Sequence, residues 1–136
     1  MTTGRPPTRQ SVSSVRVRYA ETDQMGVAYH ANYFVWFEVA RTDWLRTFGA
    51  TYRDLEAEGF FLPVIDARCH YRASARYDDE LRITATARLV SGVRLAFDYD
   101  VLGPSATIAS GQTVHAALDR QGRPVRLPAR IKELIR

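Results

Sequence analysis

The sequence has few of the features that mark secreted or membrane-spanning proteins. Its single cysteine, Cys69, has no second cysteine with which to form an intramolecular disulfide. The longest uninterrupted apolar run, from Tyr33 to Phe37, is far shorter than the ~20 residues that a membrane span needs. The first ten residues carry positive charge but no apolar stretch behind it, so no secretory signal is predicted. We therefore expect a cytoplasmic protein with no membrane span.

Lysine is nearly absent as well, because Lys132 is the only lysine among 19 basic residues. The formal net charge is +4, and arginine forks suit phosphates and carboxylates. These arginines are spread along the chain instead of forming a basic patch, so nucleic acid is not an expected partner. A small anionic ligand that carries phosphates is compatible with this composition.

Several catalytic signatures are missing. The chain contains neither a glycine-rich phosphate loop nor a Gly-x-Ser-x-Gly elbow. Its three histidines, His30, His70 and His115, fall on different predicted elements without the close spacing of a zinc site. We expect no metal and no cofactor.

What the sequence does contain is one domain's worth of regular patterning, since 136 residues suffice for a single core. Residues 1–14, rich in Pro, Ser, Thr and Arg, are predicted to be a flexible tail before a single domain over 15–136. Alternation predicts a strand over 15–19, and apolar residues at helical spacing predict a helix over 33–48. Asn32 is its expected N-cap and Gly49 its expected C′ residue, while Thr51 and Gly59 bound a short second helix.

After residue 60 the apolar period changes to two. Alternation over 65–73, 81–89 and 93–101 indicates antiparallel strands with one face on the core, and a weaker run over 108–118 suggests a central strand. A short amphipathic piece follows Pro128. The predicted fold class is α+β, with one antiparallel sheet wrapped around one long central helix. A free sheet edge or face would then be available for dimerisation.

The segment from Tyr19 to Tyr33 is the candidate for a reactive site, because it is irregular and leads into the predicted helix. Helix N-termini present unpaired N–H groups and a partial positive charge, which can polarise a carbonyl. Asp23 lies just upstream of this N-terminus, close to Glu21. Asp23 could act as a base or nucleophile on such a carbonyl, or it could only cap a turn.

Four residue pairs in this segment form a recognisable pattern: Thr22-Asp23, Gly26-Val27, Tyr29-His30 and Asn32-Tyr33. With this pattern the segment resembles the signature of the hotdog-fold 4-hydroxybenzoyl-CoA thioesterase family, and is most similar to the acyl-CoA thioesterases associated with the Tol–Pal system. The resemblance covers about residues 12–136. Ala28, where the family usually has valine, and Ser74, where many members have proline, depart from the pattern.

The resemblance implies an acyl-CoA thioesterase that acts on a small or medium acyl-CoA, aliphatic or aromatic. Asp23 matches the family's catalytic aspartate and would attack the thioester or activate water, while the N–H near His30 would polarise the thioester oxygen. Tyr29 and the His30 side chain are further catalytic candidates. The candidate substrate-binding residues are Gly26, Asn32, Tyr33 and Arg76.

The resemblance also bears on partners. Coenzyme A would be part of the substrate and not a cofactor, and acyl carrier protein is a candidate partner. The chains would form homodimers, doubled in many relatives to a homotetramer, with active sites at the dimer interface.

Two other functions fit part of the pattern. A hotdog hydratase or dehydratase would use a histidine with a carboxylate, for which His30 and Glu38 are candidates. A non-catalytic module that binds acyl thioesters or acyl carrier protein would need no catalytic aspartate.

Overall fold

The structure is a computed structural model that describes residues 9–135. A short 3₁₀ helix, η1, follows the first strand, and a long and a short helix precede the other four strands. The elements in chain order are β1 (Gln10–Arg16), η1 (Tyr19–Glu21), α1 (Asn32–Thr47), α2 (Tyr52–Ala57), β2 (Val64–Tyr71), β3 (Glu80–Leu89), β4 (Arg94–Leu102), β5 (Thr107–Ala116) and α3 (Ala129–Ile135).

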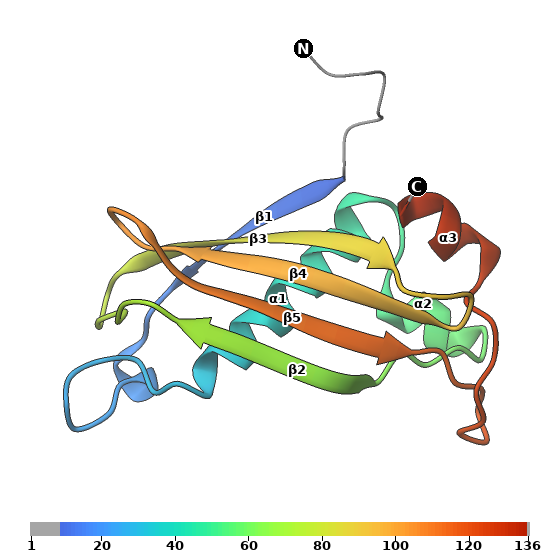
Figure 1. The fold of residues 1–136 in the computed structure, drawn as a ribbon, viewed down its shortest axis with the longest axis horizontal. Helices are drawn as coiled ribbons and strands as arrows, with labels where there is room; N and C mark the ends of the chain where they lie inside the picture. The colour runs from blue at the N-terminus through green and yellow to red at the C-terminus, as the bar shows by residue number, and fades with distance from the viewer. Residues whose placement is uncertain (1–8, 136) are drawn as a thin grey trace, which may run out of the picture.

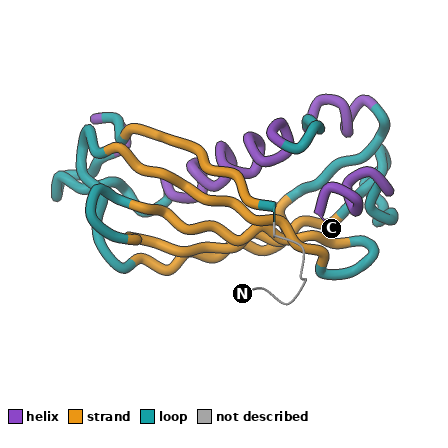
Figure 2. The backbone as a smooth tube through the Cα atoms, turned by 90° about the horizontal axis from the view of Figure 1, so that it is seen from above, coloured by secondary structure: helices purple, strands orange, loops and turns teal. Residues whose placement is uncertain are grey.

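The five strands form one antiparallel sheet in the order β1-β3-β4-β5-β2. Figure 1 looks onto this sheet, with α1 passing behind it. Figure 2, turned by 90°, shows α1 running along one face, and within residues 9–135 no helix covers the opposite face. The prediction of one sheet with a long helix on it is confirmed, as is the interior position of β5.

Helix α1 packs so closely on the sheet that one strand residue must lack a side chain. The Phe37 ring stacks on Tyr99 of β4, with ring centroids 4.3 Å apart and planes only 6° from parallel. A Cβ added at Gly111 of β5 would lie 2.4 Å from the Phe37 ring, inside any allowed contact distance. Gly111 therefore sets how near the helix can approach the sheet.

The predicted inward faces of β3 and β4 are confirmed over residues 81–87 and 95–101, where alternate apolar residues are buried in the core. Leu89 and Val93, at the hairpin between the two strands, are exposed. The corresponding prediction for β2 is wrong. Ile65 and Tyr71 remain exposed, and no residue of β2 is fully buried. The physical reason is that α1 packs mainly on β1 and β3 and barely reaches β2, so little covers the inward face of this edge strand.

The predicted flexible tail is wrong for residues 10–14, which belong to β1, while residues 1–8 lie outside the described residues. Ser11 and Ser13 point inward and are buried although they are polar. The Ser13 hydroxyl donates a 2.7 Å hydrogen bond to Asp43 on α1. Small polar side chains thus fit the narrow space between β1 and α1, and the alternation begins earlier than apolar residues indicate.

The caps of the helices follow the prediction in part. Gly49 and Gly59 adopt positive φ just past α1 and α2, and the Thr51 side chain accepts a hydrogen bond from the N–H of Asp54. Asn32 is not the N-cap of α1. It is the first helical residue, and Ala31 stands at the cap without a side-chain hydrogen bond.

A chain of hydrogen bonds crosses the core beneath α1. Tyr99 contacts Thr113 at 2.7 Å, Thr113 contacts His115 Nε2 at 2.9 Å, and His115 Nδ1 lies 2.9 Å from the carbonyl of Leu62. A carbonyl only accepts, so neutral His115 carries its proton on Nδ1 and donates to Leu62. Nε2 then accepts from Thr113, whose oxygen accepts from Tyr99. All these hydrogen bonds therefore run in one direction, from Tyr99 through Thr113 and His115 to the Leu62 carbonyl.

Candidate active site

The loop between η1 and α1 holds Asp23 through a tight local turn. The Asp23 N–H donates to the carbonyl of Val27, and the Asp23 carbonyl accepts from Gly26, whose φ is +78°. Asp23 Oδ1 accepts from the N–H of Met25 at 2.8 Å. Its other carboxylate oxygen, Oδ2, has no hydrogen-bond partner within residues 9–135. Gly26 thus makes the turn, and the turn leaves one carboxylate oxygen available.

A cavity of about 220 Å³ opens beside this carboxylate. Its aromatic wall is formed by the rings of Tyr33 and Tyr71, which meet edge to face at 4.9 Å, and by His30, which meets Tyr71 at 6.3 Å. The lining residues are Asp23, Val27, Ala28, His30, Tyr33, Tyr71, Ala73 and Ser74. The structure therefore brings Asp23, His30 and Tyr33 into one cavity.

The segment that leads into α1 borders the cavity at His30. Within the part of the chain that the structure describes, the N–H groups of His30 and Ala31 have no hydrogen-bond acceptor. Both precede a helix of 16 residues whose dipole is positive at this end. The carbonyl of His30 is occupied, because the Tyr71 hydroxyl donates to it at 2.8 Å. Although Tyr71 is partly exposed, desolvation of its hydroxyl, helped by the Cys69 thiol beside it, raises the pKa of Tyr71 and keeps the hydroxyl protonated as this donor.

Tyr71 and Glu21 are site residues that the sequence reasoning did not select. Tyr71 stood in an alternating strand pattern, so only the three-dimensional approach of β2 to His30 reveals its contact. Glu21 is buried beneath the loop, with its carboxylate 3.3 Å from the indole Nε1 of Trp36. Its place two residues before Asp23 was the only sequence signal.

The remaining predicted site residues lie near the cavity without lining it. The Tyr29 ring is half exposed and packs on His30 at 4.5 Å. The Asn32 side chain donates to the carbonyl of Glu21 at 2.8 Å, so it ties the helix to the loop. Arg76 pairs with Val27 through its backbone, and its side chain is exposed at the edge of the loop.

Glu38 does not share the cavity of His30. It lines separate hollows with Arg41 and Val64, farther along α1. One protomer therefore does not pair His30 with Glu38, as a hydratase with this pair would require.

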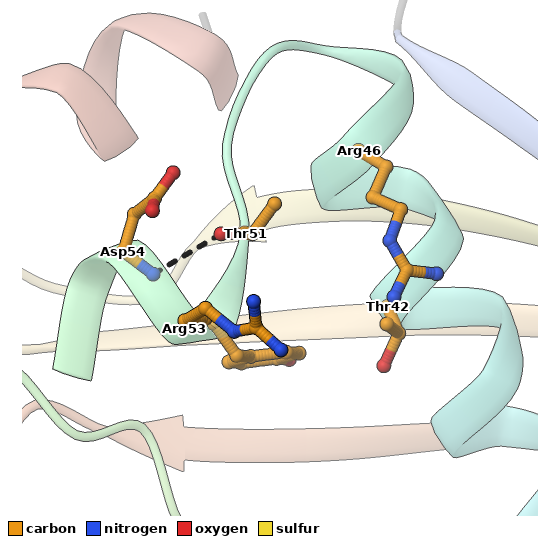
Figure 3. Close-up of a pocket in the computed structure, with 6 residues that line it drawn as sticks. Thr42, Arg46, Thr51, Arg53 and Asp54 are labelled. Carbon is orange, nitrogen blue, oxygen red and sulfur yellow. Dashed lines mark hydrogen bonds between the residues drawn. The ribbon is translucent and has the colours of Figure 1, made fainter. Parts of the chain in front are cut away.

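A larger hollow, of about 490 Å³, lies at the other end of α1 from Asp23. Figure 3 shows Arg46 and Arg53 on opposite sides of it, with the Thr51 cap of α2 between them. Arg46 lies 3.6 Å from Asp43. Asp23 and His30 do not line this hollow, so it is separate from the candidate site.

Within residues 9–135, no helix is long and apolar enough to cross a membrane. No group of three His, Cys, Asp or Glu side chains among these residues is arranged to hold a metal ion.

The chain is similar to known proteins in sequence and in structure. Residues 17–135 match the model of a family described as the thioesterase-like superfamily. The chain is 34% identical over 112 residues to YneP of Bacillus subtilis, whose name assigns it a provisional acyl-CoA thioesterase activity; the match covers 82% of this chain and 81% of YneP. It is 32% identical over 120 residues to the acyl-CoA thioesterase YbgC of Haemophilus influenzae, covering 87% and 88% of the two chains.

The fold is also similar to that of a solved structure. The DHNA-CoA thioesterase of Staphylococcus aureus superposes with a TM-score of 0.83 at 33% identity, over 87% of this chain and 80% of that one.

Proposed function

Because this chain belongs to the thioesterase-like superfamily and has its hotdog fold, we propose that it hydrolyses the thioester of a small or medium acyl-CoA, aliphatic or aromatic, to the free acid and coenzyme A. One observation carries the proposal. Asp23, whose Oδ2 is available, and His30, whose N–H is unpaired just before α1, line the same cavity.

The thioester carbonyl binds with its oxygen toward the N–H groups of His30 and Ala31. As the carbonyl carbon becomes tetrahedral, negative charge develops on this oxygen, and a single well-placed donor lowers such a barrier by ~3 kcal/mol. Asp23 Oδ2 either takes a proton from the water that attacks the carbon or attacks the carbon itself. Oδ1 stays bound to the Met25 N–H throughout, so the carboxylate does not rotate.

The tetrahedral intermediate then collapses with cleavage of the carbon–sulfur bond, and coenzyme A leaves as a thiolate. After attack by water this step gives the free acid, and the proton held by Asp23 passes through solvent to the thiolate. After attack by Asp23 it gives an acyl-aspartyl anhydride, which water hydrolyses to the free acid, restoring the carboxylate. A thiol has an ordinary pKa of ~8.5, so this leaving group needs no dedicated general acid. The His30 side chain lines the cavity and orients the water or the thioester. Tyr29, whose ring packs on His30, holds that imidazole in place.

The rest of the substrate contacts residues around the cavity. Tyr33 lines the space for the acyl group, Gly26 makes the turn beside it, and Asn32 acts through its bond to the loop. Arg76 is exposed beside the loop and reaches toward the phosphates of coenzyme A. Coenzyme A belongs to the substrate, and the reaction draws on no separate cofactor. The same thioester could be presented by acyl carrier protein.

The edge strand β2 supports pairing of two copies, with the site at their interface. Its outer edge has unpaired backbone groups, and Val64 and Ile65 on it are 42% and 46% exposed. Val64 shares a hollow with Val35 of α1, which is 51% exposed, so the apolar surface continues from strand to helix. This surface supports a homodimer, which in turn could pair into a homotetramer.

Charge along β2 is self-complementary about its centre. Asp66 and Arg68 lie 3.0 Å apart on either side of Ala67. Two antiparallel copies of β2 centred on Ala67 place Asp66 of one copy opposite Arg68 of the other. The same pairing brings the Val64 end of the second copy beside Tyr71, which lines the Asp23 cavity.

The test is thiol release from short, medium and long aliphatic acyl-CoAs and from benzoyl- and hydroxybenzoyl-CoA. We expect the wild type to hydrolyse at least one of them, and Asp23→Asn to lose roughly 10²- to 10⁴-fold in kcat. Asp54→Asn, which neutralises an exposed carboxylate on α2, is the matched control and should keep full activity.

Three results would contradict the proposal. Full activity of Asp23→Asn would remove Asp23 from the reaction. Tight binding of acyl-CoA by the wild type without turnover of any thioester, including acyl carrier protein thioesters, would make the chain a binding module. Hydration of an enoyl-CoA in place of hydrolysis would make it a hydratase.

A further inference from the structure

Glu21 is a buried acid that hydrolysis does not consume. Its side chain is only 7% exposed, and a buried carboxylate is costly unless it is hydrogen-bonded. Oε1 accepts from the N–H of Arg18 at 2.7 Å, and Oε2 accepts from the indole N–H of Trp36 at 3.3 Å. The Arg18 guanidinium lies 3.5 Å from Oε2. The carboxylate thus joins the end of β1 to the second turn of α1.

The backbone carbonyl of the same residue makes a second connection. It accepts from the N–H of Tyr29 at 2.8 Å and from the side-chain amide of Asn32 at 2.8 Å. These two donors stand immediately before and after His30 and Ala31. The unpaired N–H groups that face the thioester oxygen are therefore held between two bonds to one acceptor.

We propose that Glu21 is a positioning residue, whose bond to Trp36 sets the distance between the Asp23 carboxylate and the N–H groups at the start of α1. This role rests on the proposed hydrolysis. Asp23 is two residues downstream of Glu21, and the N–H groups are tied to the Glu21 carbonyl, so a shift of Glu21 changes both partners together. Misplacement by about 1 Å costs roughly 10²-fold in rate.

The position of Asn32 follows from the same arrangement. Its side chain is occupied by the Glu21 carbonyl and is not directed into the cavity. Asn32 therefore fixes the first turn of α1 instead of touching the acyl group.

Helix α1 offers a matched pair of variants to test the role. Trp36→Phe removes the indole N–H that reaches Glu21, and Trp44→Phe removes an indole N–H that donates to the Arg9 carbonyl at 3.2 Å. Both tryptophans are buried in the core. We expect similar losses of thermal stability, but only Trp36→Phe should lower kcat, by roughly 10- to 100-fold with little change in KM. Glu21→Gln keeps an acceptor for the indole N–H, so its kcat should lie between those of Trp36→Phe and the wild type.

Amide hydrogen exchange gives a readout that does not depend on activity. The Tyr29 N–H should exchange faster in Trp36→Phe than in wild type, and should be unchanged in Trp44→Phe. Equal kcat losses in both variants, or an unchanged Tyr29 exchange rate in Trp36→Phe, would overturn the positioning role. If the wild type hydrolyses no thioester, the proposed function fails, and the exchange rates still decide whether Glu21 holds the loop.

Discussion

The buried histidine predicts how the stability of the fold depends on pH. Burial lowers the pKa of His115 from 6.5 to about 4, and the positive charge of Arg41 acts in the same direction. The Leu62 carbonyl opposes the shift, because it accepts from the ring. Protonating Nε2 would also make it a donor toward Thr113, which now donates to it. The hydrogen-bond chain through Tyr99 would have to reverse.

The direction of the effect follows from the order of the two pKa values. The unfolded chain binds a proton at His115 below pH ~6.5, whereas the folded chain stays neutral there until pH ~4. The stabilisation is therefore complete above pH ~6.5 and is lost as the pH falls. Linkage gives a loss of about 2 kcal/mol between pH 7 and 5, approaching roughly 3 kcal/mol below pH 4.

The assay is urea unfolding at pH 7 and at pH 5, followed by circular dichroism. His115→Gln lowers stability at pH 7 but removes the titrating group, so its stability should change by about 2 kcal/mol less between these pH values than that of the wild type. His70→Gln removes an exposed histidine of β2 and should leave the wild-type difference unchanged. Equal pH dependence in wild type and His115→Gln would refute the reasoning.

Two further predictions concern packing and assembly. Gly111→Ala forces a Cβ into the Phe37 ring and should lower the free energy of unfolding by about 1–3 kcal/mol in urea titrations, whereas an unchanged midpoint would show that α1 can move away freely. Val64→Glu places a charge on the exposed edge of β2 and should convert a dimer into monomers with little thioesterase activity; sedimentation equilibrium beside the thiol-release assay measures both, and an active wild-type monomer would contradict the pairing.

Local patterns predicted the parts of the fold that depend on neighbouring residues. Alternation identified the core faces of β3 and β4, and the helical period with Gly49 identified α1 and its end. Such periods do not show where α1 lies on the sheet, so the apolar residues of β2 were assigned to a buried face that α1 barely covers.

The candidate site, too, could be predicted from the sequence only in part. Asp23 and His30 could be selected because the segment that carries them resembles a known signature, and the structure brings both to one cavity. Glu21 could not be assigned its role, because its contact with Trp36 joins residues 15 apart across a loop of no regular period. Contacts between a loop and a helix leave no periodic trace in the sequence.

Two hydrogen bonds hold the loop of the candidate site, and they differ in when they can form during folding. The first joins the Asn32 side chain to the Glu21 carbonyl, 11 residues apart, and the second joins the Tyr71 hydroxyl to the His30 carbonyl, 41 residues apart. Closing the longer ring costs about 1 kcal/mol more chain entropy, and it also awaits the pairing of β2 with β5. The loop therefore acquires its own shape before the aromatic wall of the cavity forms.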